Sequence, residues 1–252
     1  MNIPQIPQDN QRTSEWRIER LGKFTGSRIG DLMVSGRSKN VVFGATALAY
    51  IYELMSERNL SSEVIGSDEL WDEYVKLTTA TSKAMQFGTD NEADAINAFT
   101  NWLHSQESVT IGETAYDTDD LDVVRMGSMP HPTIENFAAS PDALVYVKST
   151  GEVVAVVETK VPLPKTFMQY RCEVTDAASL KATNDKYYFQ VHAEMMVSET
   201  RYAFFAAYQP FLNDSLHVAG IEMNEATAKD IEERIALAEE FIALAEEFIA
   251  AH

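Results

Sequence analysis

Two acidic residues and a lysine have the types and spacing for metal-assisted hydrolysis. With a three-residue loop, Lys148 faces Glu152 across a predicted hairpin, so paired residue numbers sum to 300 and Asp142 lies opposite Glu158. A two-residue loop changes the sum by one and still leaves these acids neighbours. Two carboxylates about 5 Å apart repel each other unless a positive group lies between them. Lys160 is two residues beyond Glu158, and strand periodicity puts it on the same face.

A third acid, Glu92, lies in a predicted helix. It falls in line with Ile96, Phe99 and Leu103, which form an apolar stripe at helical spacing. An acid on an inward stripe needs a partner. With the two hairpin acids and the lysine, Glu92 forms a candidate site for Mg²⁺, a hard cation that prefers carboxylate oxygen and water.

This acid–lysine set fits phosphodiester hydrolysis. Bound metal activates a water and neutralises charge in the transition state. The lysine can orient or deprotonate that water, or stabilise the added negative charge. The spacing alone leaves open a simpler structure, in which the lysine forms a salt bridge with one acid and the other acids are solvated.

Composition narrows the class of protein. The chain has 252 residues, of which 45% are hydrophobic and 23% charged, enough for a substantial core. No apolar run is long enough to span a membrane, and we expect no secretory leader. A single cysteine, Cys172, excludes an internal disulfide. We therefore expect a cytoplasmic protein, and the lack of a Walker-type glycine-rich loop predicts no use of ATP.

The formal net charge is −19, which argues against binding nucleic acid. The charge is uneven, however. Residues 1–40 carry seven basic and four acidic side chains, a net of +3, and the remainder carries 13 basic and 35 acidic ones, a net of −22. A basic N-terminal region on an acidic body can still bind phosphate locally.

The hydrophobic pattern predicts helices, then strands, then helices around a sheet. We expect helices at 14–21, from 25–27, at 45–57, at 82–103 with a break at Gly88, at 187–197, and from Asn224 almost to His252. Residues 110–164 are strand-like, and further strands are expected at 201–208 and 217–223, with a polar connection at 59–68 and a mixed segment at 165–186.

The last predicted helix contains a tandem duplication. Residues 235–241 and 242–248 both read Ile-Ala-Leu-Ala-Glu-Glu-Phe. This places two apolar seams side by side on the helix. The wide apolar surface either packs on the core or contacts another protein, and the sequence leaves both alternatives open.

Seven short motifs follow one another along the chain. The motifs are Arg12-Thr-Ser-Glu-Trp16, Arg20-Leu-Gly-Lys-Phe-Thr-Gly-Ser27, Phe87-Gly-Thr-Asp-Asn-Glu92, Ala139-Ser-Pro-Asp142, Glu158-Thr-Lys160-Val-Pro162, Gln190-Val-His192 and Tyr202-Ala-Phe-Phe-Ala-Ala-Tyr-Gln-Pro210. This order resembles the lambda-type phage exonucleases and the YqaJ-like viral recombinases of the PD-(D/E)xK nuclease superfamily.

The resemblance implies a restriction-endonuclease-like α/β core, with a central mixed sheet flanked by helices. Residues 1–252 would form a single nuclease domain, with a flexible arm at 1–10 and a C-terminal helix at 224–252. The implied activity is a Mg²⁺-dependent 5′→3′ exonuclease on linear double-stranded DNA, in which Mn²⁺ substitutes for Mg²⁺. It releases mononucleotides and leaves 3′ overhangs for a single-strand annealing protein.

The same resemblance implies a homotrimeric ring, whose hole basic residues would line. Two other functions stay open at this point. One is a structure- or site-specific endonuclease of the superfamily, and the other is a non-catalytic module that binds DNA ends. Some related nucleases hold an iron–sulfur cluster with four cysteines, which the single Cys172 excludes.

Site roles follow from the resemblance. The family's metal ligands correspond to Asp142, Glu158 and the backbone carbonyl of Thr159. Glu92 resembles the helix acid that completes the metal site. Lys160 resembles the catalytic lysine. The polar residues expected around the 5′-phosphate are Arg20, Ser27, Ser140 and Gln190, and Arg37 is expected to lie on a basic loop near DNA.

Three positions depart from the family pattern. Thr159 replaces the usual leucine or isoleucine, which we expect to be tolerated because only its main chain matters in the family. Ala143 replaces a common glycine. His192 replaces a frequent glutamine, and we interpret it as a structural helix histidine.

Overall fold

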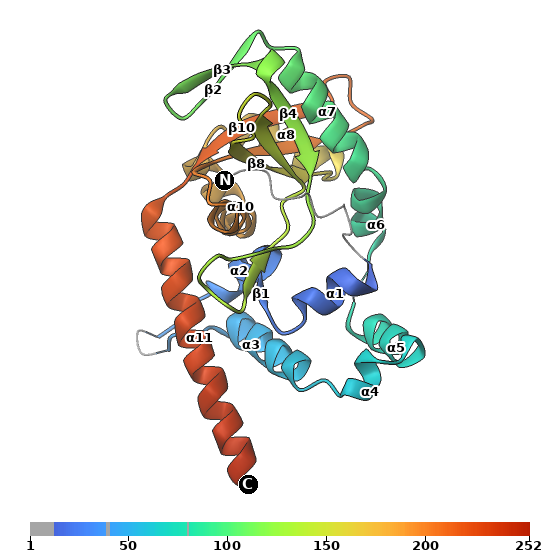
Figure 1. The fold of residues 1–252 in the computed structure, drawn as a ribbon, viewed down its shortest axis with the longest axis vertical. Coiled ribbons are helices and arrows are strands. Elements are labelled where there is room, and N and C mark those ends of the chain that lie inside the picture. The colour runs from blue at the N-terminus through green and yellow to red at the C-terminus, as the bar shows by residue number, and fades with distance from the viewer. Residues whose placement is uncertain (1–12, 39–40, 80) are drawn as a thin grey trace.

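The computed structural model describes residues 13–38, 41–79 and 81–252, so the expected arm at 1–10 lies outside the described residues (Figure 1). The helices are α1 (Ser14–Arg20), α2 (Gly26–Leu32), α3 (Ala45–Arg58), α4 (Ser62–Ile65), α5 (Asp68–Thr78), α6 (Lys83–Asp90), α7 (Glu92–His104), η1 (Thr118–Asp120), α8 (Pro164–Glu173), α9 (Ala177–Thr183), α10 (Asp185–Val197) and α11 (Glu225–Ala251). The strands are β1 (Phe24–Thr25), β2 (Ser108–Ile111), β3 (Thr114–Asp117), β4 (Leu121–Arg125), β5 (Met129–Pro130), β6 (Phe137–Ala139), β7 (Ala143–Val147), β8 (Val153–Lys160), β9 (Tyr202–Tyr208) and β10 (Leu216–Glu222).

The central sheet has five strands in the order β10-β9-β8-β7-β4. β8 and β9 are parallel, and the other neighbours are antiparallel. A parallel pair needs a long crossover, and α8, α9 and α10 provide it. The predicted α/β class, with a mixed sheet between helices, is confirmed.

Helices cover both faces of this sheet. Val157 of β8 belongs to the buried cluster that contains Phe99 of α7, whereas Val156 belongs to the cluster that contains Val191 of α10. Because side chains alternate along a strand, Glu158 lies on the α10 side. The end of β8 is therefore reached by α10 from one face and by α7 from the other.

The β7–β8 hairpin has the register that the predicted site requires. Ala143 pairs with Val157, so the predicted sum of 300 holds at the site end. The prediction for the loop was wrong by one residue, because the amide of Val147, and not that of Lys148, bonds to the carbonyl of Glu152. A bulge at Val154 of β8, between the pairs Val145–Ala155 and Tyr146–Val153, restores the register before the strand reaches the site.

Two helix boundaries differ from the predictions, and one helix was not predicted. Thr13, not Ser14, caps α1, since its side chain accepts from the amide of Trp16. The break in the 82–103 segment falls at Asn91 and not at Gly88. The sequence analysis missed α5, in which Trp71 is the one buried side chain.

The first half of α11 packs on the core, which is one of the two alternatives left open by the sequence. Asn224 caps the helix as predicted, and Ile235 and Ile242 are buried in the core. Further along, Leu244 is 68% and Phe248 63% exposed, where the helix extends beyond the body (Figure 1). The described part of the chain contains no helix whose length and hydropathy suit a membrane crossing.

His192 joins α10 to α11 and is the structural histidine that we predicted. Its ring is fully buried. Nδ1 lies 2.8 Å from the carbonyl oxygen of Tyr188, and Nε2 accepts from the amide of Asn224 at 3.1 Å. This pattern requires the neutral ring with a proton on Nδ1. Burial lowers the pKa of His192 to about 4.

His192 predicts a pH-dependent loss of stability. The pKa of His192 is lower in the folded chain than its ordinary 6.5, so the unfolded chain binds the proton more tightly. Above pH 6.5 the neutral His192 ring therefore contributes about 3 kcal/mol to the free energy of unfolding. This contribution is lost as the pH falls towards 4. Urea unfolding of the wild type and of His192→Gln near pH 7 and pH 4 measures this contribution. Parallel pH dependences of the two proteins would contradict it.

Candidate active site

The end of β8 brings the predicted lysine into contact with one of the predicted acids, Glu158. The Nζ of Lys160 contacts Oε1 of Glu158, as same-face spacing predicts. Glu158 is 1% exposed, and its Oε2 has no hydrogen-bond partner. Burial and the negative charge of Asp142 raise the pKa of Glu158 to about 7. Burial disfavours the charged form of Lys160. The carboxylates of Glu158 and Asp142 favour that form more strongly, so the pKa of Lys160 is raised.

Asp142 is fastened to the neighbouring strand. Its Oδ2 accepts from the amide of Thr159 at 2.7 Å and from the Thr159 hydroxyl at 2.6 Å. We expected only the main chain of Thr159 to matter, and the structure adds its side chain. A leucine or isoleucine at this position offers no hydroxyl, so the second bond is specific to threonine or serine.

Glu92 reaches the strand end from the α7 side. It is the first residue of α7 and pairs with Arg125 of β4 at 3.7 Å. Glu92, Thr159 and Lys160 line the same cleft of about 400 Å³. Among the described residues, however, no three Asp, Glu, His or Cys side chains are placed to hold one metal ion together. The predicted metal site is therefore not assembled in this structure, and the metal roles stay predictions.

Two of the predicted phosphate-binding residues meet directly. Nη1 of Arg20 donates to Oγ of Ser140 at 2.7 Å. The guanidinium lies over the ring of Trp16, 4.2 Å from its centroid. Burial lowers the pKa of Arg20 to about 10, so the group stays charged at neutral pH. A partly buried guanidinium beside a hydroxyl is suited to binding an anionic phosphate.

The other three predicted residues are Ser27, Arg37 and Gln190. Ser27 is exposed on α2, and Arg37 is exposed on the following loop. Gln190 lies beside Glu158, and its Nε2 donates to Oε1 of Glu158 at 2.6 Å. α2 packs tightly at Gly26, where a Cβ would lie 2.8 Å from that of Ala139. This approach fixes the start of α2 against the strand that leads to Ser140.

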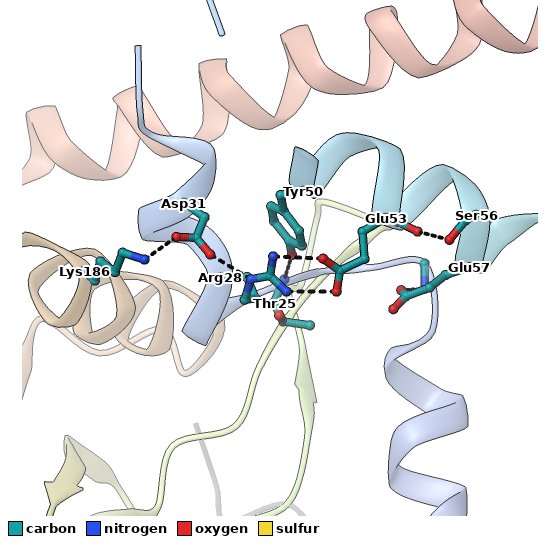
Figure 2. Close-up of polar contacts among 9 residues, drawn as sticks. Thr25, Arg28, Asp31, Tyr50, Glu53, Ser56, Glu57 and Lys186 are labelled. Carbon is teal, nitrogen blue, oxygen red and sulfur yellow. Dashed lines mark hydrogen bonds and ion pairs between the residues drawn. The ribbon is translucent and has the colours of Figure 1, made fainter. Parts of the chain in front are cut away.

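An ionic network holds α2 against α3 and α10 (Figure 2). Arg28 binds Asp31 at 2.8 Å and both carboxylate oxygens of Glu53 at 2.9 Å. Asp31 also accepts from Lys186 at 2.6 Å. The basic side chains of Arg28 and Lys186 are thus paired with acids. The backbone amide of Thr25, between α2 and Arg20, donates to the hydroxyl of Tyr50.

Comparison with known proteins decides the family. The model of the YqaJ-like viral recombinase domain matches residues 15–201. The chain belongs to this family. No curated protein matches it.

Three solved structures that resemble this YqaJ-like chain are exonucleases. The alkaline exonuclease LHK-Exo from Laribacter hongkongensis is 23% identical, with a TM-score of 0.65 over 95% of this chain and 97% of that one. A second LHK-Exo structure, in complex with dAMP, is 25% identical, with a TM-score of 0.64 over 95% and 99%. A phage-related exonuclease from Haemophilus somnus 129PT is 14% identical, with a TM-score of 0.58 over 90% and 96%. The fold is thus the predicted PD-(D/E)xK-like fold of phage-type exonucleases.

One buried acid at the YqaJ-like site was missed by the sequence analysis. Glu194 is 1% exposed on α10, where its Oε1 accepts from Nε2 of Gln190 at 2.9 Å. Burial and the nearby Glu158 raise the pKa of Glu194 well above its ordinary value. Its spacing of four residues from Gln190 was visible in the sequence, but nothing there showed that this acid is buried.

The bond from the Thr159 hydroxyl to Asp142 can be tested by Thr159→Val. This change keeps the shape and the backbone bond but removes the hydroxyl, so we expect a loss of about 1–2 kcal/mol in unfolding free energy. Denaturant titration measures it, with Thr166→Val on α8 as the matched control. A Thr159→Val protein as stable as the control would show that the hydroxyl does not hold Asp142.

Proposed function

We propose that this protein is a Mg²⁺-dependent 5′→3′ exonuclease that degrades one strand of linear double-stranded DNA to mononucleotides and leaves 3′ overhangs. The family and the exonuclease-like fold support a phage-type exonuclease. The observation that carries the proposal is the cluster of Asp142, Lys160 and the buried Glu158 at the end of the β7–β8 hairpin. This cluster lies in the fold on which such nucleases are built.

The side chains at the strand end fit a divalent cation. Glu158 is buried with one carboxylate oxygen lacking a partner, which is costly in a metal-free site. Its negative charge is further disfavoured by Asp142. A hard cation that takes carboxylate oxygens would relieve both penalties, so Mg²⁺ fits and Mn²⁺ is expected to substitute.

Asp142, Glu158 and the carbonyl of Thr159 would hold the metal, and Glu92 would complete the set from α7. A bound metal ion would supply an acidified water and charge stabilisation for phosphodiester hydrolysis. Lys160 lines the cleft that Glu92 also lines, so its ammonium can orient the attacking water and balance charge on the phosphate.

The choice of the 5′ end depends on a second group. Arg20 and Ser140 form a polar pair that fits a terminal phosphate, and we assign this role to them and to Ser27, which is exposed on α2. We also assign a contact with the duplex to Arg37, which is exposed on its loop. We further propose a homotrimeric ring and a single-strand annealing protein as the partner that receives the 3′ overhang.

Replacing Asp142 with Asn tests the metal site. The change removes a negatively charged ligand and keeps the size of the side chain, so we expect cleavage to fall by at least about a thousandfold. Binding to a 5′-phosphorylated duplex, measured by fluorescence anisotropy, should be retained. Chelation of the metal should abolish wild-type cleavage, and a covalently closed circle should resist it. A fully active Asp142→Asn protein, or cleavage of the circle, would refute the proposal.

Replacing Arg20 with Ala tests recognition of the 5′-phosphate. Wild-type protein should digest a 5′-phosphorylated duplex faster than a 5′-hydroxyl one, and Arg20→Ala should lose this preference. Loss of a charge-assisted phosphate contact of about 2–3 kcal/mol corresponds to a change of roughly 30- to 150-fold. Arg201→Ala, which removes an exposed arginine paired with Glu225, is the control. Equal wild-type rates on both ends would remove the role assigned to Arg20.

A further inference from the structure

Gly88 lies in the last turn of α6, on a wall of the cleft that Lys160 and Glu92 also line. Three usual structural reasons for a helical glycine do not apply to it. Its φ is not positive, a Cβ added to it would meet no atom of the described residues within 4 Å, and α6 continues to Asp90 with Asn91 as its cap. Because alanine is more favourable than glycine in a helix, Gly88 weakens α6 rather than stabilising it.

The wall that contains Gly88 is attached to the body of the protein. The ring of the neighbouring Phe87 stacks on Phe211, in the loop after β9, with the ring centroids 5.6 Å apart. Lys160 and Tyr187 line the same cleft, and Nζ of Lys160 lies 4.7 Å from the centroid of the Tyr187 ring. The first atom of a side chain added at position 88 would therefore lie in open space of this cleft.

α6 borders both groups of the proposed site. Its residues Met85 and Thr89 line the cleft that contains Lys160 and also a second cleft, of about 470 Å³, that contains Arg20. A DNA strand whose 5′-phosphate contacts Arg20 and whose scissile phosphate lies beside Lys160 would therefore pass along α6. Glycine is the residue that lets a helix backbone approach such a ligand closely.

We propose that Gly88 shapes the substrate site, by keeping open the space that the deoxyribose–phosphate backbone of the hydrolysed strand occupies. This role rests on the proposed function, because a DNA substrate is what gives the cleft this occupant. Gly88 contributes no side-chain atom to the reaction, and it acts by the absence of a side chain on the wall. Since a shift of about 1 Å in a bound substrate can slow a reaction about a hundredfold, one added methyl group is expected to matter.

Digestion assays with variants at position 88 test the proposal. Gly88→Ala should slow the digestion of a 5′-phosphorylated duplex by on the order of ten-fold, and Gly88→Leu by on the order of a hundredfold, because the obstruction grows with the side chain. The matched control is Gly220→Ala on β10. An added Cβ there also meets no atom of the described residues within 4 Å, and this variant should keep the wild-type rate.

Two further measurements separate obstruction of the substrate from damage to the protein. The midpoint of thermal unfolding of Gly88→Ala should equal or exceed that of the wild type, because alanine is the better helix former. Its affinity for Mn²⁺ without DNA, measured by calorimetric titration, should equal that of the wild type, because no proposed ligand is changed. If Gly88→Leu does not fold, Gly88→Ser replaces it and should lose at least as much activity as Gly88→Ala.

Three results would overturn the role of Gly88. They are an undiminished rate in Gly88→Ala, a lower unfolding midpoint in Gly88→Ala than in the wild type, and a weaker affinity of Gly88→Ala for Mn²⁺. The second result would show a structural need for glycine, and the third would place the loss at the metal site. Wild-type protein that does not digest a linear duplex would overturn the proposed function as well. Normal wild-type digestion with an undiminished rate in Gly88→Ala would overturn only the role of Gly88.

Discussion

Negative charge is crowded into a buried place at the end of β8. Asp142 and Glu158 are close enough for one to raise the pKa of the other, and Glu158 has almost no contact with water. Lys160 supplies the countercharge from two residues further along the strand. Buried acids in such a pair are unfavourable unless hydrogen bonds and a cation offset the repulsion. The surrounding structure is arranged to provide them.

Three kinds of support converge on this charge cluster. The hairpin register brings Asp142 to the strand where the amide and hydroxyl of Thr159 hold it. α10 covers one face of the sheet and carries Gln190, which bonds to Glu158. α7 covers the other face and brings Glu92 to the cleft beside Lys160. A rigid sheet end with helices on both faces is well suited to holding such groups in place.

The basic N-terminal region serves the fold as much as the site. Arg28 contributes to the positive charge of this region, but it is bound to Asp31 and Glu53 and fastens α2 to α3 (Figure 2). Arg20, in contrast, contacts a hydroxyl and an aromatic ring. Counting charges along the sequence does not separate these two roles, because the difference lies in which partners folding brings near each guanidinium.

The sequence by itself determined the local geometry of the site. Strand periodicity put Glu158 and Lys160 on one face, and the hairpin arithmetic placed Asp142 opposite them, despite an error of one residue at the loop. The order of motifs pointed to the family and to the mixed α/β fold, both of which are confirmed. These features depend on residues close in sequence or on patterns repeated along it, which a single chain displays directly.

Only the tertiary structure decided which charged groups are buried and what they contact. Nothing in the pattern around Glu194 separates it from a solvated acid, and its burial follows from the packing of α10 against the sheet. The same holds for the hydroxyl of Thr159, and for Glu92, whose partner Arg125 comes from another element. Burial and pairing are set by segments far apart in the chain, so their energetic consequences appear only once those segments meet.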